Sequence, residues 1–115
     1  MITGLKAVIY PVKNLAESKA MFERLLGVTP TVDSPYYVGF DIAGEHLGLD
    51  PNGHGWGFTG SVATWLVENI EDSLQTLRES GAEVLQSPTD VGDGAMMASV
   101  KDKDGNIIGL MQPPT

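Results

Sequence analysis

The chain contains no cysteine, which excludes disulfide bonds, thiolate metal sites and cysteine nucleophiles. Positive charge is also scarce, because seven Lys and Arg residues stand against 15 Asp and Glu residues and the formal net charge is −8. A negative protein disfavours the phosphates of nucleic acids and anionic lipid surfaces as partners. The same field favours cationic small molecules, although acidity also serves simply to keep a small protein soluble.

Long apolar runs are missing as well. None approaches the roughly 20 residues that cross a bilayer, and the first residues, MITGLKAVIYPV, resemble a strand rather than a signal peptide. We therefore expect a cytoplasmic protein with no membrane partner. The length of 115 residues and a hydrophobic fraction of 42% are those of one ordinary globular domain.

The sequence contains an internal repeat. The segment AVIYPVKNLAESKAMFERLLGV at 7–28 aligns with VATWLVENIEDSLQTLRESGAEV at 62–84, so that Val12 matches Val67 and Asn14 matches Asn69. After a gap the correspondence resumes, and Gly48 then matches Gly109. Two copies in a chain of this size indicate a duplicated supersecondary unit whose copies share one core.

Each copy has the pattern of a βαβββ unit. In the first copy we expect a strand over 5–12, a helix over 15–26 capped by Asn14 and ended by Gly27, and strands over 36–40 and 46–49 joined by a turn. A glycine-rich loop over 51–61 follows. In the second copy we expect a strand over 62–67, an Asn69-capped helix ending at Ser80, and strands over 83–86, 95–100 and 106–111. The predicted fold class is α+β.

The order YPVKNLAESKAMFERLLG, glycine-rich loop, WLVENIEDSLQTLRESGAEV and VKDKDGNIIGLMQ resembles the vicinal oxygen chelate superfamily, which includes glyoxalases, bleomycin resistance proteins and extradiol dioxygenases. The resemblance covers almost the whole chain. It implies a single domain over 1–115, with module 1 at about 3–52, a linker loop at 53–60 and module 2 at about 61–113. It also implies that two tandem βαβββ modules form a curved mixed sheet around a cleft, with the helices on the outer face, and that the protein is a homodimer.

Enzymes of this superfamily hold a metal on four ligands, one from the first and one from the last strand of each module. Carried over onto the motifs of this chain, those positions are Ala7, Gly48, Val62 and Gly109. None of these side chains can coordinate a metal ion, which needs nitrogen or oxygen donors. The resemblance, combined with these four residues, predicts a protein with no metal and no other cofactor.

Strand alternation predicts which other side chains share a face with these four positions. The predicted ligand-binding residues are Ala7, Ile9, His46, Gly48, Asp50, Trp56, Phe58, Val62, Thr64, Met97, Gly109 and Met111. Catalytic residues are not assigned. His46 can be a base, a hydrogen-bond partner or simply a solvated side chain. Trp56 and Phe58 can stack on a planar ligand or anchor their loop. Tyr36 and Tyr37 must face opposite ways, and the sequence does not say which of them faces the cleft.

The function that we predict is small-molecule binding without the superfamily metal, in which the protein sequesters an antibiotic or another planar or cationic ligand. The alternative is a metal-dependent lyase, isomerase or dioxygenase with a displaced metal site around His46, drawing on Glu45, Asp50 or His54. A third interpretation is an inert or regulatory dimer whose cleft is filled by its own side chains.

Overall fold

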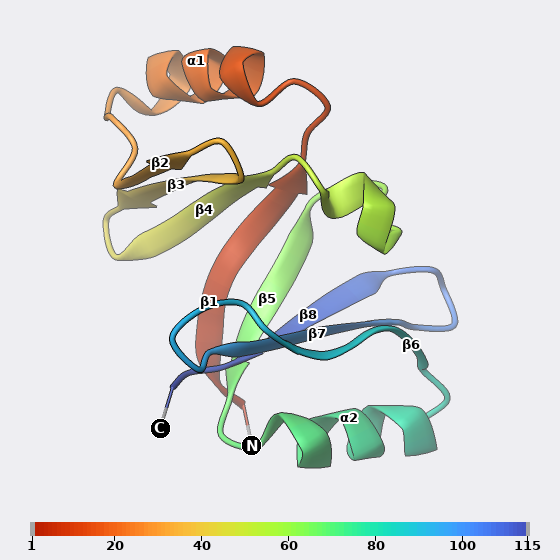
Figure 1. Cartoon of the computed structure of the whole chain (residues 1–115). Coiled ribbons are helices and arrows are strands. Elements are labelled where there is room, and N and C mark those ends of the chain that lie inside the picture. Colours follow the sequence, from red (N-terminus) through yellow and green to blue (C-terminus); the bar gives the residue numbers. More distant parts are fainter. Residues whose placement is uncertain (1, 115) are drawn as a thin grey trace. The chain divides into compact units, whose positions relative to one another are not determined.

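The computed structural model describes residues 2–114, which contain two α-helices, eight strands and one short 3-10 helix (Figure 1). The chain divides into two compact units, Ala7–Val62 and the combination of Met1–Lys6 with Ala63–Thr115. That 1–115 forms a single domain stays a prediction, and its two end residues, 1 and 115, lie outside the described residues.

The first unit is built on the part of β1 (Ile2–Pro11) that begins at Ala7, together with α1 (Leu15–Leu26), β2 (Val32–Ser34), β3 (Tyr37–Ile42) and β4 (Glu45–Asp50). Its strands lie in the order β2-β3-β4-β1, with β1 parallel to β4 and the other neighbours antiparallel. The predicted helix has the observed bounds. The sequence did not locate β2, because three residues are too few for an alternating pattern to be recognised.

The second unit repeats this plan with β5 (Val62–Val67), α2 (Ile70–Glu79), β6 (Glu83–Asp90), β7 (Met96–Lys101) and β8 (Ile107–Gln112). The strand order is β5-β8-β7-β6, and β5 runs parallel to β8. Strand β6 extends beyond the predicted 83–86 and shifts its register twice before Thr89. Pro88 lies in this irregular stretch, where its missing N–H breaks no regular ladder. The glycine-rich loop between the modules contains η1 (Gly53–Trp56).

The two helices begin in the same way. The Asn14 side-chain oxygen accepts the Glu17 N–H at 3.1 Å, and the Asn69 oxygen accepts the Asp72 N–H at the same distance. Both N-caps were predicted, because an Asn side chain can satisfy an N–H group that lacks a partner in the first turn. Helix α1 ends at Gly27, which adopts the left-handed conformation with φ of 71°.

The turn between β3 and β4 sets the register of that hairpin. Ala43 and Gly44 both have positive φ, 51° and 84°, as a two-residue hairpin turn requires. Counting outward from the turn places Asp41 opposite His46 and Gly39 opposite Gly48.

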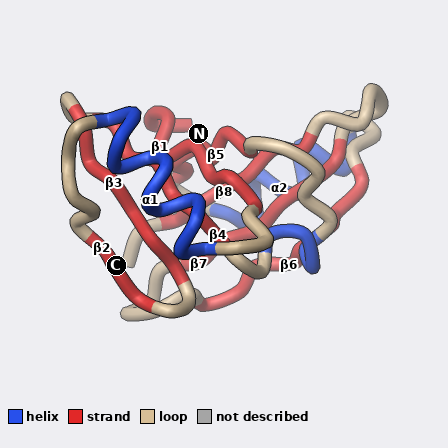
Figure 2. Tube along the Cα trace, turned by 90° about the horizontal axis from the view of Figure 1, so that it is seen from above, coloured by secondary structure: helices blue, strands red, loops and turns tan. Residues whose placement is uncertain are grey.

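Each unit has its own hydrophobic core between its helix and one face of its sheet. In the first unit Val38, Phe40 and Leu49 are fully buried, and Phe22 of α1 packs against them. In the second unit Leu74 of α2 and Leu110 of β8 are equally inaccessible. Figures 1 and 2 show α1 lying along β3, in agreement with the contacts between these elements.

The α+β class and the two βαβββ modules are confirmed. Strand alternation predicts which strand residues face the helices, and the two cores contain seven of them: Tyr10, Leu47, Leu49, Trp65, Val67, Ile108 and Leu110. Across residues 2–114 neither helix is long and apolar enough to cross a membrane.

Candidate functional site

In the first unit a polar face of the sheet lies opposite α1. Val38, Phe40 and Leu49 point into the helix-side core, so the residues that alternate with them lie on the other face. Those residues are Ala7 and Ile9 on β1, Tyr37, Gly39 and Asp41 on β3, and His46, Gly48 and Asp50 on β4. Gly48 lies at the centre of this face, with Ile9 and Gly39 as its neighbours on the flanking strands.

Three side chains of this face form a hydrogen-bonded chain. The Tyr37 hydroxyl oxygen lies 2.6 Å from His46 Nε2, and His46 Nδ1 lies 2.9 Å from Asp41 Oδ1. The other carboxylate oxygen of Asp41 accepts the hydroxyl of Thr31. The His46 side chain is 19% exposed, so the middle member of the chain is largely shielded from water.

Two glycines make room for the two rings. A Cβ atom at Gly48 would lie 2.0 Å from the Tyr37 hydroxyl oxygen, and one at Gly39 would lie 2.7 Å from His46 Cε1. Real side chains do not approach so closely, so both rings lie directly over bare backbone. The Tyr37 hydroxyl thus occupies the place where any side chain at position 48 would begin.

The environment keeps the Tyr37 phenol protonated. Burial raises the pKa of its hydroxyl to about 12 from the ordinary 10.0, and the negative charges of Asp50 and Asp41 add to the rise. The phenol is therefore a neutral hydrogen-bonding group at physiological pH.

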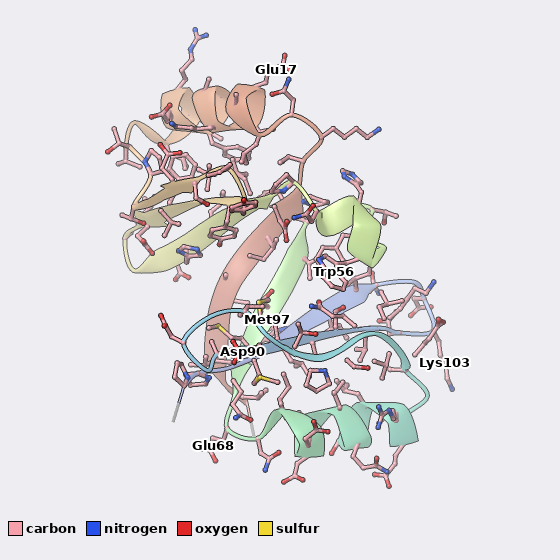
Figure 3. The ribbon with its side chains drawn as sticks, viewed as in Figure 1. Glu17, Trp56, Glu68, Asp90, Met97 and Lys103 are labelled. Atoms are coloured by element: carbon pink, nitrogen blue, oxygen red, sulfur yellow. The ribbon has the colours of Figure 1, made fainter. Side chains whose placement is uncertain are left out.

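The corresponding face of the second unit is less polar. Gly109 on β8 again lies between two neighbours, Thr64 on β5 and Ser99 on β7. Both neighbours are 1% exposed, and neither hydroxyl has a hydrogen-bond partner among the described residues. Met97 and Met111 are neighbours across β7 and β8, and Figure 3 shows Met97 on the side of β7 opposite α2.

Gly109 is enclosed by its neighbour on β5. A Cβ atom there would lie 2.6 Å from the Thr64 hydroxyl oxygen and 3.3 Å from the Thr64 Cα. Because one of these atoms belongs to the backbone, the close approach of β5 and β8 favours glycine at this position even without the Thr64 hydroxyl.

The four positions that the resemblance assigns to metal ligands do not fit a metal ion. Ala7, Gly48, Val62 and Gly109 offer a methyl, an isopropyl or no side chain, and none of these contains a donor atom. Ala7 and Val62 are buried, and the space next to each glycine is taken by Tyr37 or Thr64.

The structure does not gather the alternative ligands that we considered. Between residues 2 and 114, no three His, Asp or Glu side chains are grouped closely enough to hold a metal ion. His46 contacts Tyr37 and Asp41, whereas Asp50 accepts the N–H of Asn52 at 2.8 Å. His54 lies on η1, and Glu45 is exposed.

The two aromatic residues of the glycine-rich loop differ in exposure. Phe58 is 7% exposed and lies close to Gly53, so it packs as an anchor of the loop. Trp56 is 41% exposed at the end of η1 (Figure 3). Of these two residues, Trp56 presents the larger open surface.

Sequence reasoning missed Gly39, Asp41 and Ser99 as site residues, and it left the side of Tyr37 open. The predicted turn at Ala43 and Gly44 contained the information needed to find Gly39 and Asp41. A two-residue hairpin turn fixes every opposed pair, and pairing from it would have placed Asp41 opposite His46.

A separate hollow of about 360 Å³ lies along α1 and is lined by Glu17, Ala20, Met21 and Arg24. None of the predicted site residues borders it. Because it is open and lined by two turns of a single helix, we do not assign it a role.

A family model described as the Glyoxalase/Bleomycin resistance protein/Dioxygenase superfamily matches residues 4–110. No protein of curated function matches the chain by sequence.

Solved structures share the fold at low identity. A protein from Legionella pneumophila described as an NAD-dependent benzaldehyde dehydrogenase is 22% identical, with a TM-score of 0.75 over 92% of this chain and 96% of that one. A glyoxalase/bleomycin resistance protein/dioxygenase superfamily member from Vibrio splendidus is 20% identical, with a TM-score of 0.72 over 94% and 97%. The methylmalonyl-CoA epimerase of Mycobacterium tuberculosis is 16% identical, with a TM-score of 0.69 over 99% and 90%. At these identities the likeness extends to the fold alone, and the different activities in these descriptions do not indicate one function.

Proposed function

Because the chain belongs to the glyoxalase/bleomycin resistance protein/dioxygenase superfamily, we propose that it is a member that binds a small molecule without the superfamily metal. The proposed ligand is planar or cationic, and the proposed role is sequestration, as in resistance to an antibiotic. The protein holds this ligand without transforming it.

The observation that carries the proposal is the chemistry of the four positions where the superfamily places its metal ligands. Ala7, Gly48, Val62 and Gly109 provide no donor atom, and side chains from neighbouring strands occupy the space next to the two glycines. Metal-assisted chemistry requires a bound ion that polarises the substrate, and these residues do not supply its ligands.

Charge supports a cationic ligand. The chain has a formal net charge of −8, and Asp41 and Asp50 both lie on the polar face around Gly48. A concentration of carboxylates attracts cations and repels anions.

Elemental analysis of protein purified without chelators tests the absence of the metal. We expect nickel, zinc, iron and manganese to be far below one ion per chain. One equivalent of any of these metals, removed by a chelator together with the ability to bind ligand, contradicts the proposal.

Thermal denaturation in the presence of bleomycin and other cationic natural products tests ligand binding. A ligand that binds only the folded protein raises its melting temperature. Asp50→Asn should weaken the stabilisation, whereas Asp72→Asn, which removes the same charge from an exposed position on α2, should leave it nearly unchanged. If no compound of such a panel raises the melting temperature, sequestration loses its support.

A further inference from the structure

The hydrogen-bonded chain on the polar face of the first unit has a defined direction. A carboxylate accepts hydrogen bonds and does not donate them, so His46 Nδ1 must carry the hydrogen that points to Asp41. In a neutral imidazole the other nitrogen is then an acceptor. With His46 in its neutral form, Nε2 therefore receives the hydroxyl hydrogen of Tyr37, whose oxygen lies 2.6 Å away.

This direction determines what Tyr37 can offer to another molecule. Because its only hydrogen is directed to His46, the phenol oxygen keeps its lone pairs and has no hydrogen left to donate. Among the described groups, the carboxylates of Asp50 and Asp41 are the charges that act on this phenol. An acceptor oxygen in a negative environment favours a positively charged donor group.

Two glycines and Thr31 hold the side chains of this hydrogen-bonded chain in place. Gly39 and Gly48 leave the space that the two rings fill, and a Cβ atom at either position would collide with them. Thr31 holds the second oxygen of Asp41, and its backbone N–H also bonds to the carbonyl of Gly39 at 2.8 Å. The acceptor oxygen is thus fixed in place before any ligand arrives, which lowers the entropy lost on binding.

We propose that the Tyr37 hydroxyl oxygen, oriented by His46 and Asp41, is the acceptor that binds a protonated amine of the ligand. This inference rests on the proposed function and names the chemical group that the first unit recognises. His46 and Asp41 are positioning residues, because they act through the hydroxyl of Tyr37. In this way a fixed acceptor replaces, at Gly48, the metal ligand that the superfamily places there.

The tautomer of His46 tests the direction of the chain in the free protein. Nitrogen-15 NMR at about pH 8, where a histidine side chain is ordinarily neutral, should find the hydrogen on Nδ1 of His46. Asp41→Asn should disturb this preference, because the amide can present a donor instead. A hydrogen found on Nε2 in the unmodified protein overturns the proposal, although ligand sequestration without a metal would be unaffected.

Two small probes of similar size and opposite charge test the preference for a cation. Benzylammonium should shift the backbone amide signals of Tyr37, Gly39 and Gly48 in an NMR titration, and benzoate should not. Tyr37→Phe should weaken benzylammonium binding at least about tenfold, the effect of losing a hydrogen bond to a charged group. Tyr36→Phe removes a hydroxyl from the adjacent, 75% exposed residue and is the matched control.

The outcomes separate the two proposals. Equal binding of benzylammonium by Tyr37→Phe and by the unmodified protein, or binding of benzoate at Tyr37, overturns the role of the hydroxyl while leaving the metal-free function standing. One equivalent of bound metal, or no stabilisation by any compound of the thermal panel, defeats the proposed function even when the tautomer is the expected one.

Discussion

The two units place a glycine at the same point of the same plan and surround it with different chemistry. Gly48 and Gly109 each lie on the last strand of a module, between a parallel neighbour and an antiparallel one. The Tyr37 phenol lies over Gly48 and is hydrogen-bonded to His46, which is in turn hydrogen-bonded to Asp41. Next to Gly109 lie two buried hydroxyls that have no partner among the described residues.

The difference shows that one frame can have glycine at the same position in both units and fill the space beside it in two ways. In the first unit, polar groups fill the space and satisfy one another. In the second unit, packing dominates, because a Cβ atom at position 109 would meet the Thr64 hydroxyl at 2.6 Å and would also be tight against the Thr64 Cα at 3.3 Å. We therefore assign the proposed polar recognition to the first unit.

Substituting each glycine by alanine should produce the largest effects. Gly48→Ala and Gly109→Ala should each lower the free energy of unfolding by about 2 to 3 kcal/mol, the usual penalty for overpacking. Truncating the neighbouring side chain, Tyr37 or Thr64, should then affect the two penalties differently. In a Tyr37→Ala background, Gly48→Ala should cost much less, because the three atoms nearest to the new Cβ all belong to the Tyr37 side chain. In a Thr64→Ala background, about half the penalty at Gly109 should remain, because the Thr64 Cα stays 3.3 Å away.

Urea denaturation of these two double-mutant cycles measures the coupling in each unit. Gly55→Ala is a suitable control, because a Cβ atom there meets nothing within 4 Å. Equal coupling in the two cycles would remove the distinction between a side-chain and a backbone obstacle.

Alkaline pH should act on the first unit through Tyr37. Its pKa is about 12 in the folded protein and 10.0 ordinarily, so the folded state holds this proton more tightly. The associated stability is complete below pH 10 and is lost as the pH rises towards 12. After allowance for the solvated part of the side chain, the loss is at most about 2 kcal/mol. The unfolding free energy should therefore fall more steeply with pH in the unmodified protein than in Tyr37→Phe, and parallel curves would show that this phenol contributes nothing.

Removing a hydroxyl should have opposite signs in the two units at neutral pH. Tyr37→Phe should destabilise the protein by about 1 kcal/mol, because His46 Nε2 loses its partner. Thr64→Val should stabilise it by about 1 kcal/mol, because a buried hydroxyl without a partner is replaced by a methyl group. Thr89→Val, at an exposed hydroxyl that bonds to the Ser87 carbonyl, is the control. If thermal or chemical denaturation shows Thr64→Val to be destabilising, that hydroxyl has a hydrogen-bond partner in solution.

The smallest expected difference concerns the helix caps, where the units are alike. Asn14→Ala and Asn69→Ala should each lower the free energy of unfolding by about 1 kcal/mol. Both side chains accept one N–H at 3.1 Å, so the two effects should agree within the error of chemical denaturation. A clear inequality would mean that the two helices contribute differently to the stability of their units.

The fold could be predicted from the sequence to the extent that its signals are local or repeated. Asn14 and Gly27 bound α1 through hydrogen bonds and backbone conformations within a few residues, so both ends were found. The repeat located the second module. Strand β2 was missed because three residues carry no period, and the length of β6 was underestimated because register shifts interrupt its alternation.

The site was predicted only in part. Alternation from Gly48 placed His46 and Asp50 on the right face, but their partners depend on the neighbouring strand. Finding Asp41 required the pairing register of β3 with β4, and placing Tyr37 required the start of β3. The hydroxyls of Thr64 and Ser99 could not be foreseen as lacking partners, since that property depends on every atom around them.

The contact between Gly48 and Tyr37 also limits how the protein can change by mutation. A side chain at position 48 would place its Cβ atom 2.0 Å from the phenol oxygen, so the Tyr37 ring must move before that position can provide a ligand. Shortening Tyr37 first leaves room at position 48. A donor at position 48 therefore requires Tyr37 to be displaced or shortened, so substitutions at these two positions depend on each other.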